Sequence, residues 1–76
     1  MKVFIAGATG GLGRLAVTRL IAAGHDVTGI ARTDRSAALL DRLGATPARL
    51  DLFDDTAVTS AVAGHEVVMN LATRIP

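Results

Sequence analysis

The chain has 76 residues, half of them apolar, and a formal net charge of +1 at pH 7. A chain of this length holds one small domain, its basic residues are too dispersed for a nucleic-acid-binding patch, and no apolar run is long enough to span a membrane. It contains no cysteine, which excludes disulfides and thiolate metal sites. The chain enters a strand pattern directly after Met1, with no signal-peptide pattern before it, so we expect a soluble, cytoplasmic protein.

The first half of the chain predicts two strands separated by a helix. The apolar run Lys2–Ala6 is typical of a parallel strand that is covered on both faces. Apolar residues then recur at helical spacing over Leu12–Ala23, and Gly24 ends this helix. The second strand is expected over Asp26–Ala31.

The second half repeats this alternation. We expect a helix capped by Asp34 and extending through Leu43, a weaker strand over Ala45–Leu50, a helix capped by Asp54 or Asp55 and extending through Ala63, and a strand over Glu66–Ala72. Pro47 lacks the N–H that an interior strand needs, so it favours either an edge position or a later start for the third strand.

Alternating strands and helices with short connections predict an α/β fold with parallel strands and right-handed crossovers. We therefore expect a three-layer, Rossmann-like fold with the strand order 3-2-1-4, which is half of a doubly wound domain.

The stretch "GATGGLG", from Gly7 to Gly13, lies where the first strand becomes the first helix. Gly7 permits a tight turn, and Gly10 and Gly11 leave the backbone bare, so that a pyrophosphate can approach the N–H groups at the helix start. Gly13 lets the helix lie close to the strand, and Thr9 offers a hydroxyl to the loop or to a phosphate. The alternative is a set of turn glycines, but three glycines at this spacing between strand and helix favour nucleotide binding.

The same stretch resembles the short-chain dehydrogenase/reductase superfamily, in its extended and atypical branches. These branches contain nucleotide-sugar epimerases and dehydratases, together with NAD(P)H-binding reductases. Three further stretches are similar in the expected order: "GHDVTGIAR" to the second strand and ribose site, "LDLFD" to the end of the third strand, and "HEVVMNLAT" to the fourth strand.

The resemblance implies a role for individual residues. The pyrophosphate would be held by the backbone of Gly7, Ala8, Thr9, Gly10, Gly11 and Leu12. Asp51 and Leu52 would contact the adenine, Leu71 and Ala72 would pass beneath the adenosine ribose toward the nicotinamide, and Asn70 would fix the end of the fourth strand. Two alternatives stay open: Asp51 as a turn or cap residue, and Asn70 as a hydrogen-bonded core amide.

The choice of cofactor depends on the end of the second strand. NAD binding favours an acidic residue there, about 20 residues after the glycines, but this chain has Ala31 followed by Arg32. A guanidinium can form a charge-assisted fork with a 2′-phosphate. We therefore expect NADP rather than NAD, with Arg32 as the residue that binds the 2′-phosphate. Arg35 is interpreted as part of the solvated helix surface, with a second charge at the phosphate as the alternative.

The catalytic Tyr-x-x-x-Lys pair of the short-chain dehydrogenase/reductase superfamily is absent, since the chain has no tyrosine and its only lysine is Lys2. We expect no catalytic and no metal-binding residue, and we interpret His25 and His65 as exposed turn residues at the amino edge of the sheet. The sequence is thus interpreted as the N-terminal part, residues 1–76, of an NAD(P)-binding domain from an oxidoreductase or epimerase/dehydratase.

Two alternatives to this interpretation remain. The first is a module from a non-catalytic, dinucleotide-sensing regulator, and the second is a structural module that binds nothing. The expected partners are the dinucleotide, and either the rest of the parent domain or a second copy along the fourth-strand edge.

Overall fold

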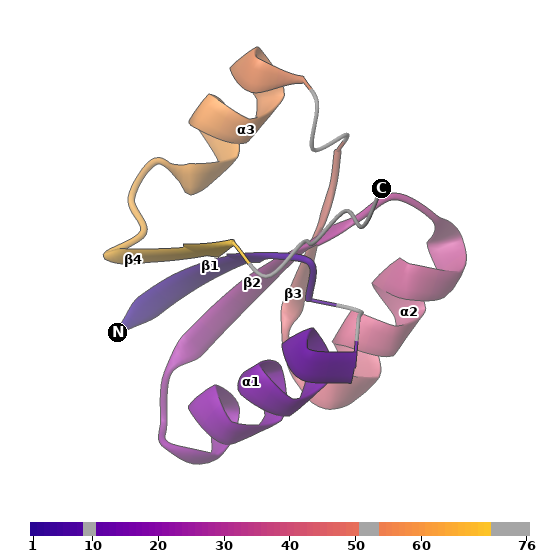
Figure 1. The fold of residues 1–76 in the computed structure, drawn as a ribbon, viewed down its shortest axis with the longest axis vertical. Helices are drawn as coiled ribbons and strands as arrows, with labels where there is room; N and C mark the ends of the chain where they lie inside the picture. The colour runs from indigo at the N-terminus through magenta and orange to yellow at the C-terminus, as the bar shows by residue number, and fades with distance from the viewer. Residues whose placement is uncertain (9–10, 51–53, 71–76) are drawn as a thin grey trace.

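A parallel sheet lies between helices in the computed structural model, which describes residues 1–8, 11–50 and 54–70 (Figure 1). In chain order the elements are β1 (Lys2–Ala6), α1 (Gly11–Ala22), β2 (Asp26–Ala31), α2 (Asp34–Leu43), β3 (Thr46–Arg49), α3 (Asp55–Val62) and β4 (Val67–Asn70). Within the described residues the sheet has four strands in the order β3-β2-β1-β4, and every pair is parallel. The predicted fold class and strand order are therefore confirmed.

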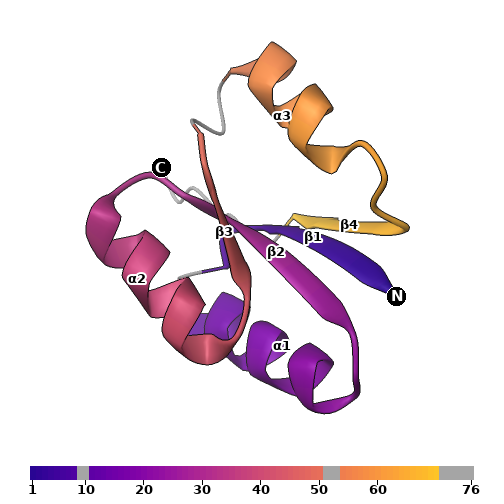
Figure 2. The same cartoon turned by 180° about the vertical axis from the view of Figure 1, so that it is seen from behind.

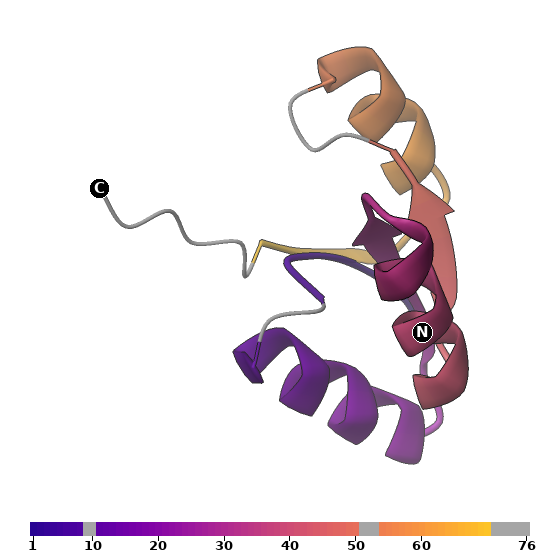
Figure 3. The ribbon, with the colours of Figure 1, turned by 90° about the vertical axis from the view of Figure 1, so that its right-hand side faces the viewer.

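The helices are divided between the two faces of the sheet. α1 and α2 pack on one face, and α3 lies on the other, as the views from behind and from the side show (Figures 2 and 3). This division follows from right-handed crossovers, because the chain moves outward from β1 to β3 and then returns past β1 to β4. In the described part of the chain, no helix is both long and apolar enough to cross a membrane.

Successive side chains of β1 point to opposite faces and enter two separate cores. Val3 and Ile5 join the core beneath α1 and α2, which also contains Val17 and Leu40. Phe4 and Ala6 join the smaller core on the α3 face. β1 is buried on both faces, as its continuous apolar run predicted.

Two cap assignments are decided by the backbone. Asp34 does not cap α2, because it is already the first helical residue; Thr33, with the extended φ of −130°, is the cap. The Thr33 hydroxyl accepts a hydrogen bond from the backbone N–H of Ser36 at 3.1 Å. In return, the Ser36 hydroxyl accepts one from the backbone N–H of Thr33, also at 3.1 Å. Asp54, rather than Asp55, caps α3 by accepting the N–H of Ala57 at 3.0 Å.

The other boundaries agree with the expected ones to within a residue or two. β3 covers only Thr46–Arg49 and lies at the sheet edge, which confirms the position inferred from Pro47. β4 is described for Val67–Asn70, and the expected continuation through Leu71 and Ala72 lies outside the described residues.

Candidate functional site

The turn after β1 requires glycine at its first residue. Gly7 has a φ of 81°, in the left-handed region that residues with a side chain rarely adopt. This conformation turns the chain away from the sheet immediately after Ala6, the last residue of β1. The turn is therefore placed at the carboxyl end of the central strand, where ligands bind in open α/β sheets.

Gly13 holds the first turn of α1 against this turn. A Cβ atom at Gly13 would lie 2.0 Å from the carbonyl oxygen of Gly7 and 2.9 Å from two backbone atoms of Ala8. Only a residue without a side chain allows this approach. The spacing of Gly7 and Gly13 thus reflects direct contact between the start of the helix and the end of the strand.

A second close approach, at Gly29 of β2, was missed in the sequence analysis. A Cβ atom there would lie 2.8 Å from the Cβ of Ala8 and 3.0 Å from Cδ1 of Leu40. Ala8 itself is completely buried. A glycine inside a strand often marks such an approach, so the signal was present in the sequence.

The same helix start is open to solvent on its other side. Apart from its own helix and its chain neighbours, a Cβ atom at Gly11 would meet no heavy atom of the described residues within 4 Å, and Leu12 is 66% exposed. The first turn of a helix leaves N–H groups without partners inside the helix and carries a partial positive charge. The arrangement can therefore accept an anionic group; Thr9 and Gly10 lie outside the described residues.

The carboxyl end of β2 carries positive charge beside a small residue. Ala31 is completely buried, and the Arg32 side chain that follows is exposed. Arg49, the neighbour of Ala31 on β3, forms an ion pair from its Nη1 to Oδ1 of Asp34. No carboxylate occupies the position of Ala31, so the described end of β2 lacks the acidic residue that NAD binding favours.

The remaining predicted contacts are not all described. Asp51, Leu52, Leu71 and Ala72 lie outside the described residues, and their roles stay predictions. Asn70 is the last residue of β4, in register with Ala6 of β1, and it is exposed. In the described structure Asn70 is therefore not a buried core amide, and its role at the end of β4 stays a prediction.

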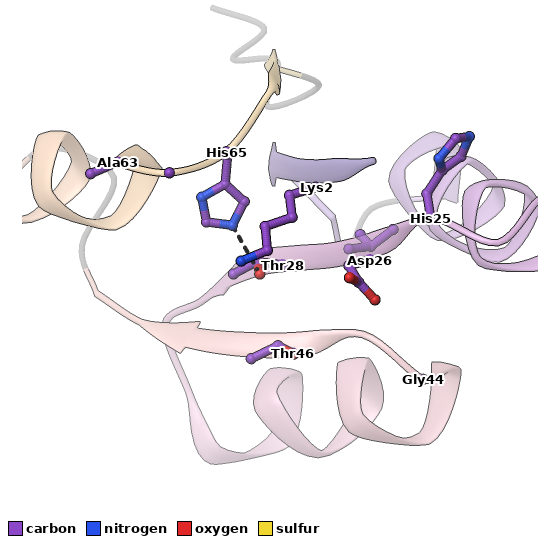
Figure 4. A pocket seen from close by; sticks show the side chains of 10 residues that line it. Lys2, His25, Asp26, Thr28, Gly44, Thr46, Ala63 and His65 are labelled. Carbon is purple, nitrogen blue, oxygen red and sulfur yellow. Dashed lines mark hydrogen bonds between the residues drawn. The ribbon is translucent and has the colours of Figure 1, made fainter.

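The two histidines lie at the opposite edge of the sheet, as expected, but they are partly buried rather than exposed (Figure 4). The His65 ring packs edge-on against Phe4 at a centroid distance of 5.4 Å, and its Nε2 lies 3.2 Å from the hydroxyl of Thr28. Both histidines line a cavity of about 430 Å³ with Lys2 and Asp26. This cavity lies at the amino ends of the strands, away from the glycine turn.

No group of three or more His, Asp or Glu side chains within the described ranges is arranged to hold a metal ion.

The candidate site consists of a glycine turn, an open helix start and a basic strand end, all at the carboxyl edge of the sheet.

A comparison with known protein families identifies the family to which this candidate site belongs. A family model described as NAD(P)H-binding matches residues 7–74, which is most of the chain. The chain belongs to this NAD(P)H-binding family. The matched range starts at Gly7 and includes the glycine turn, the end of β2 and β4, so the predicted resemblance to dinucleotide-binding reductases and epimerases is confirmed.

Individual relatives of this NAD(P)H-binding chain agree with the assignment. A sterol-4-alpha-carboxylate 3-dehydrogenase (decarboxylating) from Dictyostelium discoideum is 33% identical over 74 residues, which are 97% of this chain and 23% of that protein. The chain spans about a quarter or less of the length of the first curated relatives it matches.

Solved structures show the same fold. A Bacillus halodurans protein described as an NAD-dependent epimerase/dehydratase has a TM-score of 0.86 and 26% identity, over 100% of this chain and 35% of that one. An NADPH-dependent quinone oxidoreductase from Escherichia coli has a TM-score of 0.78 and 31% identity, over 90% of this chain and 26% of that one. Neighbours of the NAD(P)H-binding chain are thus described with either cofactor.

Proposed function

We propose that this NAD(P)H-binding chain prefers NADP(H) and forms the N-terminal part of the cofactor domain of an oxidoreductase or epimerase/dehydratase. The observation that carries the preference is the end of β2, where a buried Ala31 is followed by the exposed Arg32. A 2′-phosphate would meet a guanidinium there, and the position of Ala31 carries no carboxylate to repel it.

The turn after β1 fits the pyrophosphate of such a cofactor. Gly13 brings the helix start close to the strand end, and the space beside Gly11 is open on the solvent side. In this proposal the backbone of Gly7, Ala8, Thr9, Gly10, Gly11 and Leu12 binds the pyrophosphate, as the positive end of α1 favours an anion. Asp51 and Leu52 would contact the adenine, and Leu71 and Ala72 would lie beneath the ribose.

The chain's part in the reaction is to bind and orient the cofactor. The nicotinamide ring, when bound, supplies hydride transfer. The Tyr-x-x-x-Lys pair and the substrate site would belong to other residues of the parent protein, because the present sequence contains no tyrosine. In this proposal the chain binds the phosphates at one edge of the sheet and leaves the nicotinamide side to that remainder.

Reversing the charge at Arg32 tests the preference. We expect Arg32→Asp to weaken NADP binding by about 10- to 100-fold, because a charge-assisted contact contributes about 1.5–3 kcal/mol and repulsion adds to the loss. NAD binding should change much less, since NAD carries no 2′-phosphate. Titration calorimetry with both cofactors measures the two affinities, and Arg42→Asp, at the far end of α2, is the control. Equal losses for both cofactors would show that Arg32 does not bind the 2′-phosphate.

We also propose that β4 pairs with another chain or with the rest of the parent domain. β4 ends the sheet order among the described residues, and Val68 on it is 57% exposed. Open apolar strand edges recruit further strands. Sedimentation of the 76-residue chain over a concentration series should show association, which Val68→Lys should reduce. A compact monomer at every concentration, with or without NADP, would contradict this part of the proposal.

A further inference from the structure

The ion pair between Asp34 and Arg49 lies beside the proposed 2′-phosphate position. Asp34 is the first residue of α2, and Arg49 is the last residue of β3, so the pair joins the start of a helix to the end of the following strand, across 15 residues of the chain. Arg49 is in register with Ala31, the residue that ends β2. The pair is therefore held next to the strand end at which dinucleotide folds distinguish NAD from NADP.

Asp34 presents a negative charge at this strand end. Its side chain is fully exposed, while that of Arg49 is about half buried, with 49% exposed. A carboxylate near the 2′ position repels a phosphate and favours the ribose hydroxyls of NAD. Asp34 alone would thus oppose the preference proposed for Arg32.

Arg49 counteracts this carboxylate and can contact a phosphate at the same time. A guanidinium has five N–H donors in a planar fork, and the contact with Asp34 is made through Nη1. The hydroxyls of Thr33 and Ser36, which lie between Arg32 and the body of α2, are engaged in the capping box. The groups available to a phosphate at this end of β2 are therefore the arginine side chains and the charge of Asp34, because the two hydroxyls already form hydrogen bonds with each other's backbone.

We propose that the Asp34–Arg49 pair sets cofactor selectivity: Arg49 neutralises Asp34 and supplies a second guanidinium to the 2′-phosphate beside Arg32. This inference rests on the proposed function, in which the end of β2 receives the adenosine ribose. A purely structural role is the competing explanation, although exposed ion pairs contribute little to folding stability. The two explanations differ in whether selectivity or stability changes when the pair is broken.

Two small probes isolate the 2′-phosphate. Adenosine 2′,5′-bisphosphate carries it and adenosine 5′-monophosphate does not, so the ratio of their affinities measures recognition of that group alone. We expect Arg49→Met to weaken bisphosphate binding about tenfold and monophosphate binding less than about twofold, because the contact is lost and Asp34 is left unneutralised. Asp34→Asn should strengthen bisphosphate binding, and the double variant should lie between Arg49→Met and the unmodified chain.

The control is Arg42→Met, which removes the same charge from the last turn of α2 and should leave the affinity ratio unchanged. Circular dichroism and urea unfolding should show that Arg49→Met folds with nearly unchanged stability. A loss of stability without a change in the affinity ratio would overturn the inference and favour the structural role.

The outcomes also separate this inference from the proposed function. If Arg32→Asp changes the affinity ratio and Arg49→Met does not, the inference fails and the proposed function stands. If the unmodified chain binds both probes equally, the proposed NADP preference fails, and the inference fails with it. If it binds neither probe nor the dinucleotides, the proposed function itself is wrong.

Discussion

Replacing Gly13 by alanine is expected to destabilise the chain by about 3 kcal/mol or more and to prevent stable folding. The added Cβ would lie 2.0 Å from the Gly7 carbonyl oxygen and 2.9 Å from backbone atoms of Ala8. Backbone atoms cannot move aside as a flexible side chain can, so α1 would have to leave the sheet. A domain of this size has about 4–11 kcal/mol of stability in total, so this loss is a large part of it. Urea unfolding followed by circular dichroism measures the change.

Gly11→Ala is the matched control, because it makes the same substitution in the same helical turn. Among the described residues, a Cβ atom at Gly11 meets no heavy atom within 4 Å outside its own helix and chain neighbours, so we expect the free energy of unfolding to change by no more than about 1 kcal/mol. Comparable losses for the two variants would show that close approach at Gly13 is not what constrains the helix start.

Phe4→Ala is expected to lower the free energy of unfolding by about 3–5 kcal/mol, which is the usual loss when a buried phenylalanine is replaced by alanine. Phe4 is 1% exposed and centres the small core on the α3 face, together with Ala6 and Ile30. Its ring also contacts His65 in the turn before β4. Thermal and urea unfolding should therefore show a chain that is mostly unfolded at room temperature, with a smaller loss for Phe4→Leu.

Val68→Ala is the control for this prediction. Val68 is in register with Phe4 on the neighbouring strand, yet it is 57% exposed. Removing exposed apolar atoms leaves no cavity, so at a concentration where the chain is monomeric we expect the free energy of unfolding to change by less than about 1 kcal/mol. A loss at Val68 as large as that at Phe4 would mean that the α3 face is covered in solution, for example by a second copy of the chain.

Cofactor selectivity connects these structural constraints to function. Gly7 and Gly13 place the helix start at the carboxyl edge of the sheet, and the register of β2 and β3 places Ala31 beside Arg49 at that same edge. The proposed phosphate contacts at the two places thus depend on a shared sheet. A variant that shifts α1 would weaken the binding of both NADP and NAD, whereas changes at Arg32 or Arg49 would weaken mainly the binding of NADP.

The sequence by itself determined the element order, the parallel sheet and the family. Strand and helix periodicities are local, and their alternation, together with the glycine turn after the first strand, indicated the strand order 3-2-1-4 of a doubly wound fold. The glycine spacing from Gly7 to Gly13 was sufficient to locate the turn, because tight turns and close approach restrict which residues fit. Pro47 likewise placed β3 at the edge, since a missing N–H is a property of the residue alone.

Only the tertiary structure decided the features that depend on contacts across the sheet. Thr33 and Asp34 are both common cap residues, and the backbone conformation at Thr33 decides between them. The packing of His65 against Phe4, and the pairing of Asp34 with Arg49, join residues that are far apart in the chain. Such contacts follow from strand register and side-chain direction, which no local pattern specifies. For that reason Arg32 could be placed at the end of β2 from the sequence, whereas the Asp34–Arg49 pair beside it could not.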